Sequence, residues 1–337
     1  MSLPSTMRAI TLLTPQTYDP HNPPTSLTLT TLPIPVPSAT QALLRITATA
    51  ITPYELSWPM PASTPRPRIP AHDVAGTIIS SPSEQFQPGD RVFALMPCFV
   101  VQGGLAEYAV CDVEFLVKIP DGLGDVEAAS VPRAALTAVQ ACGWAALKQG
   151  QKVLVTGATG AVGRMVVQVV RRAVGGKGAV VAVGGVGSEG LKGLGTGLVV
   201  NYRDVEGGWW EDVVRKGVEG GQVDAFVDCV GGESLERGTK LVKSGGRIVT
   251  VGSPPPAWAR KGENGWEEIE ENGVEKLFFI VEEDGKQLKE VAGLLESGDL
   301  KPSVGLVIDG LTEEGVRNAY AKGLKGGLSG SAVVKIA

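Results

Sequence analysis

The sequence predicts an α/β protein of two domains, one rich in β-strands and one built on a doubly wound parallel sheet. Its 337 residues exceed the size at which a single hydrophobic core usually stops growing. Residues 1 to about 60 are rich in Pro and Thr and carry short β-type runs between prolines. From about residue 125, apolar runs alternate with helical patterns, which is typical of parallel strands joined by crossover helices.

The strand-rich part is expected to form a small barrel-like domain. Short apolar runs between turn residues predict strands over 27–30, 42–46, 75–79, 91–94 and 106–110. After a helical pattern at 286–296, strand character returns at 304–308 and 332–336. We therefore expect residues 1–124 and 285–337 to form one domain around a second domain of residues 125–284.

The middle of the chain is expected to form the parallel sheet. Six apolar runs predict its strands, at 152–156, 179–183, 198–201, 224–229, 247–251 and 277–281. An Ala-rich helical pattern at 126–147 precedes them and is expected to break at Pro132. The insertion at 254–272, rich in Pro, Trp and Glu, is predicted to be a surface loop with a short helix.

Composition and charge exclude several classes of protein. A net charge of −5 and a pI near 5.3 give no basic footprint for nucleic acid or for an anionic membrane surface. The four cysteines have no C-x-x-C pair, which argues against a disulfide framework and a structural zinc site. Neither a signal-peptide core nor an apolar run of about 18 residues is found, so we expect a cytoplasmic protein.

A glycine-rich turn lies between the predicted strand at 152–156 and the helical pattern at 162–173. In this context, glycines allow a tight turn, close approach of backbone amides to a pyrophosphate, and close packing of helix on strand. The helix N-terminus also favours the negative charge of the phosphates. We therefore predict that a dinucleotide binds at Gly157, Ala158, Thr159, Gly160, Ala161, Val162 and Gly163.

The end of the second parallel strand indicates which dinucleotide binds. An Asp or Glu there would bind the ribose 2′-hydroxyl of NAD and repel the 2′-phosphate of NADP. Residues 183–188 contain no acid, and the first one is Glu189, so the sequence favours NADPH. Candidate residues around the phosphate are Gly184, Ser188, Lys192, Tyr202 and Arg203, although Lys192 and Arg203 could equally belong to a solvated face.

With these features in place, the sequence resembles the medium-chain dehydrogenase/reductase superfamily, in its zinc-free quinone-reductase-like and enoyl-reductase-like branch. The matching segments are residues 69–77, 88–92, 103–108, 118–121, 136–138 and 227–232. The resemblance implies a GroES-like catalytic domain formed by both chain ends, a Rossmann domain between them, and an active cleft at their junction.

The resemblance also implies further contacts. It places the hydroxyl of Thr137 against the nicotinamide ribose and adds Val230 and Val251 to the cofactor site. Phe278 and Phe279 resemble the family's segment that enters the cleft, although a buried strand would look the same. The strand at 247–251 lies where the family pairs its sheets edge to edge, so a homodimer is plausible.

Zinc members of the superfamily bind the metal through a Cys, a His and a second Cys. The matching positions here are Thr52, His72 and Arg133. A hydroxyl, one imidazole and a cationic guanidinium cannot make a catalytic zinc site. The only other histidine is His21, so no metal is expected, and for His72 a structural hydrogen-bonding role is favoured over a catalytic one.

The zinc-free branch often carries Asn-Pro-x-Asp near its active site, where this chain has Thr52-Pro53-Tyr54-Glu55. Tyr54 could donate to a carbonyl oxygen or pack as a strand-end aromatic residue. Arg133 could stabilise an enolate, bind an acidic substrate or form a salt bridge. Thr52, Tyr54 and Arg133 are therefore the candidate catalytic residues.

The resulting hypothesis is zinc-independent hydride transfer from NADPH to a quinone or an α,β-unsaturated carbonyl. An alternative is a non-redox protein on the same fold, either a cyclase or a binding module that keeps NADP as a structural group.

Overall fold

The computed structural model describes residues 3–13, 24–58, 67–98, 102–252, 254–259, 266–269 and 272–336. His21 lies outside these residues. The chain divides into two compact units, residues 1–133 with 283–337 (unit 1) and residues 134–282 (unit 2). No helix among the described residues has the length and apolar character needed to cross a bilayer.

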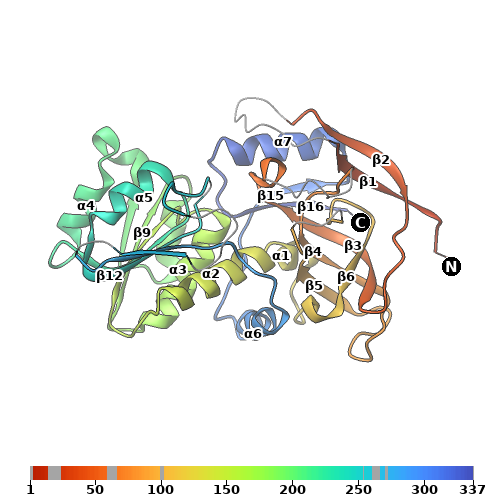
Figure 1. Ribbon diagram of the computed structural model, residues 1–337, viewed down its shortest axis with the longest axis horizontal. Helices are drawn as coiled ribbons and strands as arrows, with labels where there is room; N and C mark the ends of the chain where they lie inside the picture. Colours follow the sequence, from red (N-terminus) through yellow and green to blue (C-terminus); the bar gives the residue numbers. More distant parts are fainter. Residues whose placement is uncertain are drawn as a thin grey trace. The chain divides into compact units, whose positions relative to one another are not determined.

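Unit 1 is built around a seven-stranded sheet in the order β15-β16-β3-β4-β5-β7, with β6 also paired to β3 (Figure 1). Its strands are β3 (Gln41–Ile51), β4 (Asp73–Ser80), β5 (Arg91–Leu95), β6 (Tyr108–Asp112), β7 (Val117–Lys118), β15 (Val304–Asp309) and β16 (Ser331–Lys335). Antiparallel pairing of Ala332 with Ile51 joins the two ends of the chain in this sheet. A separate pair, β1 (Thr6–Leu12) and β2 (Leu27–Pro33), packs its apolar residues into the same core.

Two longer helices of unit 1 come from the end of the chain. Helix α6 (Gly285–Glu296) begins where the Asp284 carboxylate accepts hydrogen bonds from two first-turn amides, which caps it. Helix α7 (Glu313–Leu324) begins after Thr312 and lies beside β2 in Figure 1. It buries Val316, Ala319 and Tyr320, whereas the shorter α1 (Asp125–Ala129) packs on β3 and β4.

Unit 2 contains a seven-stranded sheet in the order β10-β9-β8-β11-β12-β14-β13. Its strands are β8 (Lys152–Thr156), β9 (Ala179–Gly184), β10 (Leu198–Asn201), β11 (Val223–Asp228), β12 (Val242–Thr250), β13 (Trp266–Ile269) and β14 (Glu275–Phe278). The first six in spatial order are parallel, with the strand order of a doubly wound sheet. The predicted fold class is confirmed.

The helices of unit 2 follow the strands as predicted. They are α2 (Pro132–Trp144), which begins in unit 1, α3 (Ala161–Val174), α4 (Trp210–Gly217), α5 (Gly232–Thr239) and the 3₁₀ helix η3 (Ser188–Leu194). The predicted break at Pro132 is confirmed, because this proline starts α2, where its missing N–H costs no helical hydrogen bond.

Two predictions about the end of this sheet are wrong. The insertion at 254–272 was expected to be a surface loop with a short helix, but residues 266–269 of it form strand β13, which pairs antiparallel with β14. The strand at 247–251 was expected at an edge available for dimerisation. It lies in β12, whose two edges are hydrogen-bonded to β11 and β14, so it has no free edge to offer a second copy.

Candidate functional site

The turn between β8 and α3 has the geometry of a phosphate cradle. Gly157 adopts φ +64°, in the left-handed region that glycine tolerates. A Cβ on Gly163 would stand 2.1 Å from the carbonyl oxygen of Gly157, so only glycine fits where the helix meets the turn. Gly160, at the N-cap of α3, has no side chain to cover the first amides of the helix. This end of α3 fits the pyrophosphate of a dinucleotide.

A buried aspartate at the end of β11 organises the strand ends beside this turn. The Asp228 carboxylate accepts hydrogen bonds from the hydroxyls of Thr156 and Thr250, both at 2.6 Å. It also accepts from the amides of Val230 and Gly231, at 3.2 and 2.8 Å. Asp228 thus ties together the ends of β8, β11 and β12. Asp228 was not among the residues predicted from the sequence, although it lies in a matching segment at the end of a buried strand.

The Asp228 contacts also hold Val230 near the turn. A Cβ on Gly157 would stand 3.0 Å from Cγ2 of Val230, and Val230 is 46% exposed. The Val251 amide donates to the carbonyl of Asp228 at 3.0 Å. Thr137 lies on α2 and is buried. The structure therefore places Val230 and Val251 at the same strand ends as the turn, while the cofactor contacts of all three residues stay predictions.

The end of β9 is crowded where a cofactor-selecting acid would stand. A Cβ on Gly184 would lie 2.6 Å from Cγ2 of Thr159, and one on Gly185 would lie 2.8 Å from the hydroxyl of Tyr202. The buried hydroxyl of Ser188 donates to the carbonyl of Gly185 at 2.6 Å, so its proton is already engaged. Gly184, Ser188 and Tyr202 therefore come together as the sequence suggested.

The two remaining cations suggested for this end of the sheet are more exposed. Lys192 lies on the outer part of η3, and the Arg203 guanidinium stands 6.0 Å from the centre of the Tyr202 ring. The side chains of Lys192 and Arg203 are both exposed to solvent. Both readings given for them, phosphate ligand and solvated face, stay open.

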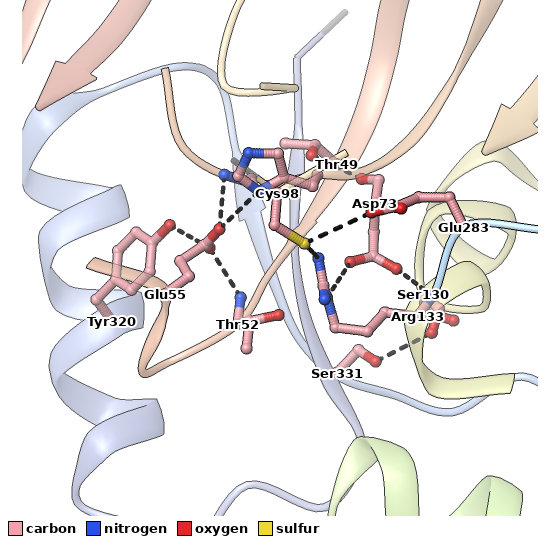
Figure 2. Close-up of polar contacts among 12 residues, drawn as sticks. Thr49, Thr52, Glu55, Asp73, Cys98, Ser130, Arg133, Glu283, Tyr320 and Ser331 are labelled. Carbon is pink, nitrogen blue, oxygen red and sulfur yellow. Dashed lines mark hydrogen bonds and ion pairs between the residues drawn. The ribbon is translucent and has the colours of Figure 1, made fainter. Parts of the chain in front are cut away.

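In unit 1, a buried carboxylate gathers residues from distant parts of the chain (Figure 2). Glu55 lies in the short 3₁₀ helix η1 (Glu55–Ser57). Its Oε1 accepts from the Thr52 amide at 3.0 Å and from the Tyr320 hydroxyl at 2.6 Å. Its Oε2 accepts from the Ala71 amide at 3.0 Å and pairs with Nδ1 of His72 at 3.2 Å. Burial raises the pKa of Glu55, but its bonds to His72, Tyr320 and Thr52 outweigh burial and hold that pKa below its usual value.

This carboxylate orients His72. An ionised carboxylate only accepts hydrogen bonds, so Nδ1 of His72 is the donor in their contact. The other ring nitrogen, Nε2, is buried and has no hydrogen-bond partner among the described residues. The structural role favoured for His72 is supported by its bond to Glu55, and the role of Nε2 stays open.

Arg133 lies in a second part of the same polar region. Its amide and its Nε donate to the two carboxylate oxygens of Asp73, at 2.5 and 3.2 Å, and its Nη2 contacts Sγ of Cys98 at 3.2 Å. The guanidinium also stands 5.2 Å from the centre of the Trp58 ring. Of the roles suggested for Arg133, the salt bridge is therefore present in the structure. Figure 2 shows the side chain between Asp73 and Cys98.

Burial strongly shifts the pKa values of Asp73 and Cys98, the two partners of Arg133. Burial raises the pKa of Asp73 to about 6, even though the nearby Arg133 cation acts to lower it. Burial also raises the pKa of the Cys98 thiol, which outweighs the opposite effect of Arg133. Cys98 is therefore a neutral thiol at neutral pH, and Sγ also contacts the Glu283 carboxylate at 3.8 Å.

The residues at the zinc-ligand positions do not fit a catalytic zinc ion. Thr52 offers a hydroxyl in place of a thiolate, and the guanidinium of Arg133 is fixed by Asp73 and Cys98. A fixed cation would repel a metal ion. Among the described residues, no three His, Cys, Asp or Glu side chains are grouped so that they could hold a metal ion.

The three candidate catalytic residues all belong to unit 1, where Thr52 and Tyr54 lie two residues apart and Arg133 comes from a later segment of the chain. Tyr54 precedes η1, and its carbonyl accepts a bond from the Ser57 hydroxyl at 2.8 Å. The Thr52 amide donates to the Glu55 carboxylate, and the Thr52 hydroxyl makes no hydrogen bond to the described residues. Glu55, Asp73 and Tyr320 were not singled out. Glu55 could have been found from its place in Thr52-Pro53-Tyr54-Glu55, where the related branch has an Asp. Nothing in the sequence links Tyr320 to Glu55.

Comparison with known proteins identifies families that match both parts of the chain. The family model for the alcohol dehydrogenase GroES-like domain matches residues 38–121, and that for zinc-binding dehydrogenases matches residues 194–334. A probable zinc-binding oxidoreductase, mitochondrial, of Arthroderma benhamiae is 34% identical over 82% of this chain and 84% of its own length. The chain belongs to the medium-chain dehydrogenase/reductase superfamily, in its quinone oxidoreductase-like branch.

Two further relatives within this superfamily carry more specific names. The human quinone oxidoreductase is 28% identical over 81% of the chain and 82% of its own length. The NADPH-dependent alkenal/one oxidoreductase, chloroplastic, of Arabidopsis thaliana is 25% identical over 78% of the chain and 64% of its own length. The chain is thus a medium-chain oxidoreductase that resembles quinone and enone reductases, and a nicotinamide cofactor is typical of this family.

Proposed function

We propose that this protein is a zinc-independent, NADPH-dependent reductase of a quinone or an α,β-unsaturated carbonyl compound. The observation that carries the proposal is the fixed guanidinium of Arg133, held by Asp73 and Cys98 where zinc members have a thiolate ligand. A guanidinium can stabilise a developing oxyanion, which is the task of the metal in zinc enzymes. A quinone is itself a conjugated carbonyl compound, so one kind of chemistry serves both substrate classes.

The choice of NADPH is supported by the end of β9. No acid stands at residues 183–188, and the Cβ positions of Gly184 and Gly185 are already occupied by Thr159 and Tyr202. The name of the Arabidopsis relative points to the same cofactor. The amides at the start of α3 would hold the pyrophosphate, and Thr137, Val230 and Val251 would contact the nicotinamide end. Bound NADPH supplies the hydride.

The chain's own residues would stabilise charge and deliver the proton. When hydride adds to the β-carbon of an enone, the electron pair moves onto the carbonyl oxygen, which needs hydrogen-bond donors. The hydroxyl of Thr52, the phenol of Tyr54 and the Arg133 guanidinium are the proposed donors. Removing one such donor typically lowers the rate about 10²-fold. The proton that completes the reduction would come from Tyr54 or water.

The proposed partners are small molecules, and the proposed location is the cytoplasm. We also keep the homodimer as a proposal, but without a role for β12. A second copy would have to use a different surface, which sedimentation of the purified protein can detect.

The experiment is a substrate panel. Oxidation of NADPH and of NADH is followed by loss of absorbance with quinones, enones, saturated ketones and alcohols. The proposal expects turnover with quinones or enones and a preference for NADPH. Tyr54→Phe and Arg133→Gln are expected to lose turnover, with Tyr108→Phe as the matched control. Cofactor binding without oxidation of any substrate would instead favour a non-redox protein, and full turnover in both variants would refute the assigned roles.

A further inference from the structure

An arginine directly follows the third glycine of the phosphate turn. Arg164 lies in the first turn of α3 (Ala161–Val174), directly after Gly163. Because a Cβ on Gly163 would collide with the Gly157 carbonyl, the backbone at this point is held tightly against the turn. The base of the Arg164 side chain is therefore fixed relative to the residues that would hold the pyrophosphate.

The side chain of Arg164 reaches the segment that follows β9. A Cβ on Gly190, in η3 (Ser188–Leu194), would stand 3.6 Å from Nη1 and 3.8 Å from Nη2 of Arg164. The guanidinium thus lies against the backbone of η3 at Gly190, five residues after Gly185. Helix α3 and η3 also contact each other.

This is the place where a doubly wound fold distinguishes its two dinucleotides. The ribose 2′ position of the adenosine half lies at the carboxyl end of the second strand, here β9. A guanidinium suits a phosphate there, because its planar fork can donate two parallel hydrogen bonds to phosphate oxygens. Tyr202 approaches the same strand end at Gly185, so a phosphate there could meet a cation and a phenol.

The charge environment of Arg164 supports a receptor for an anion. The side chain is partly buried, and burial lowers its pKa, with the Glu189 carboxylate acting in the opposite direction. A partly buried cation is less screened by solvent than Lys192 on the outer part of η3. The Glu189 carboxylate attracts the Arg164 cation, so a bound phosphate would have to compete with it.

We propose that Arg164 recognises the 2′-phosphate of NADPH and is the residue that determines cofactor specificity. This rests on the proposed use of NADPH. It goes beyond that proposal by assigning the selection to one side chain, with Lys192 and Arg203 contributing less. Glu189 moderates the affinity, because its charge opposes that of the phosphate.

The test uses the cofactor-free protein and two adenosine fragments. Adenosine 2′,5′-bisphosphate carries the 2′-phosphate, and adenosine 5′-monophosphate lacks it. Binding of each is measured by calorimetry, so that turnover is not needed. The variants are Arg164→Gln, Lys192→Gln, Arg203→Gln and Glu189→Gln. Arg172→Gln is the matched control, because it removes the same charge from an exposed position about 12 Å further along α3.

We expect the wild-type protein to bind the bisphosphate more tightly. Arg164→Gln is expected to weaken its binding about tenfold or more and leave the monophosphate nearly unchanged. Glu189→Gln should tighten binding of the bisphosphate only, and Arg172→Gln should change neither fragment. Unfolding temperatures close to wild type would show that the variants are folded.

Two different failures can be distinguished. If the wild-type protein bound both fragments equally, the proposed use of NADPH would be wrong, and this inference with it. If the wild-type protein preferred the bisphosphate but Arg164→Gln kept that preference, only the role of Arg164 would be wrong. Loss of the preference in Lys192→Gln or Arg203→Gln would then identify the residue responsible.

Discussion

The hydroxyl of Tyr320 donates a 2.6 Å hydrogen bond to the buried carboxylate of Glu55, 265 residues earlier in the chain. Through Glu55, helix α7 near the C-terminus is connected to Thr52 and His72, at two of the positions that hold zinc in other members of the superfamily. The C-terminal segment therefore helps to position the candidate site, in addition to completing the sheet of unit 1.

Replacing Tyr320 with Phe should destabilise the protein by about 1.5–3 kcal/mol, because it removes a hydrogen bond to a buried charged group. Denaturant unfolding would measure this. Tyr108→Phe is the control, since the Tyr108 hydroxyl makes no hydrogen bond to the described residues and its loss should cost less than about 0.5 kcal/mol. Equal stability of the two variants would show that the Tyr320 bond contributes nothing.

The stability of the protein should also reveal the charge state of Asp73. Its pKa is raised in the folded protein to about 6, from 3.8, so the folded state binds a proton more readily than the unfolded state. Tighter binding of this proton stabilises the folded state by roughly 3 kcal/mol below pH 3.8. The stabilisation is lost as the pH rises through about 6.

The measurement is the free energy of unfolding between pH 4 and 7 for the wild-type protein and Asp73→Asn. The difference between the two should shift across this window, because the variant has no proton to lose. Glu55 acts in the opposite sense and at lower pH, where protonation of a carboxylate with a lowered pKa removes stability. A pH-independent difference between wild type and Asp73→Asn would contradict the raised pKa.

The phosphate turn leads to a sharper prediction. Gly163→Ala places a Cβ 2.1 Å from the carbonyl oxygen of Gly157, so the backbone must shift. We expect a loss of more than about 2 kcal/mol of stability and at least about tenfold weaker dinucleotide binding. Gly143→Ala on α2 is the control. A Cβ there meets no atom within 4 Å, and this change should stabilise the helix by up to about 1 kcal/mol.

A change in Asp228 should loosen the strand ends around the cofactor. Asp228→Asn keeps the shape but turns one acceptor oxygen into a donor that faces one backbone amide and one hydroxyl, both of which donate to that oxygen in the wild type. We expect a loss of about 1–3 kcal/mol in stability, together with weaker dinucleotide binding. Asp309→Asn serves as the control, since Asp309 also ends a parallel strand but is exposed. Wild-type cofactor affinity in Asp228→Asn would show that this aspartate does not organise the site.

The features that could be predicted from the sequence are local in the chain. The phosphate turn was predictable because its strand, glycines and helix occupy consecutive residues from Lys152 to Val174. Neutral residues at the end of β9 were equally visible. The hydrogen bond between Tyr320 and Glu55 could not be predicted, because a contact between residues 265 positions apart leaves no periodic pattern in the sequence.

The two wrong predictions concern neighbouring strands of the same sheet but have different origins. Strand β13 is four residues long and lies in a segment with many charged residues, too short for its alternation to stand out. Strand β12 is an interior strand because β14, at a position where the sequence predicts a strand, pairs with its second edge. The environment of Arg133 was equally hard to foresee, since its partners Asp73 and Cys98 come from two other segments.

The central claim is conjugate reduction by NADPH without a metal, and isotope transfer tests it most directly. Metal-free protein, verified by elemental analysis, is given NADPH deuterated at C4 of the nicotinamide and an enone that proves to be a substrate. The product is then analysed by nuclear magnetic resonance. We predict deuterium at the β-carbon. Deuterium at the carbonyl carbon, or turnover only after zinc is added, would contradict the account.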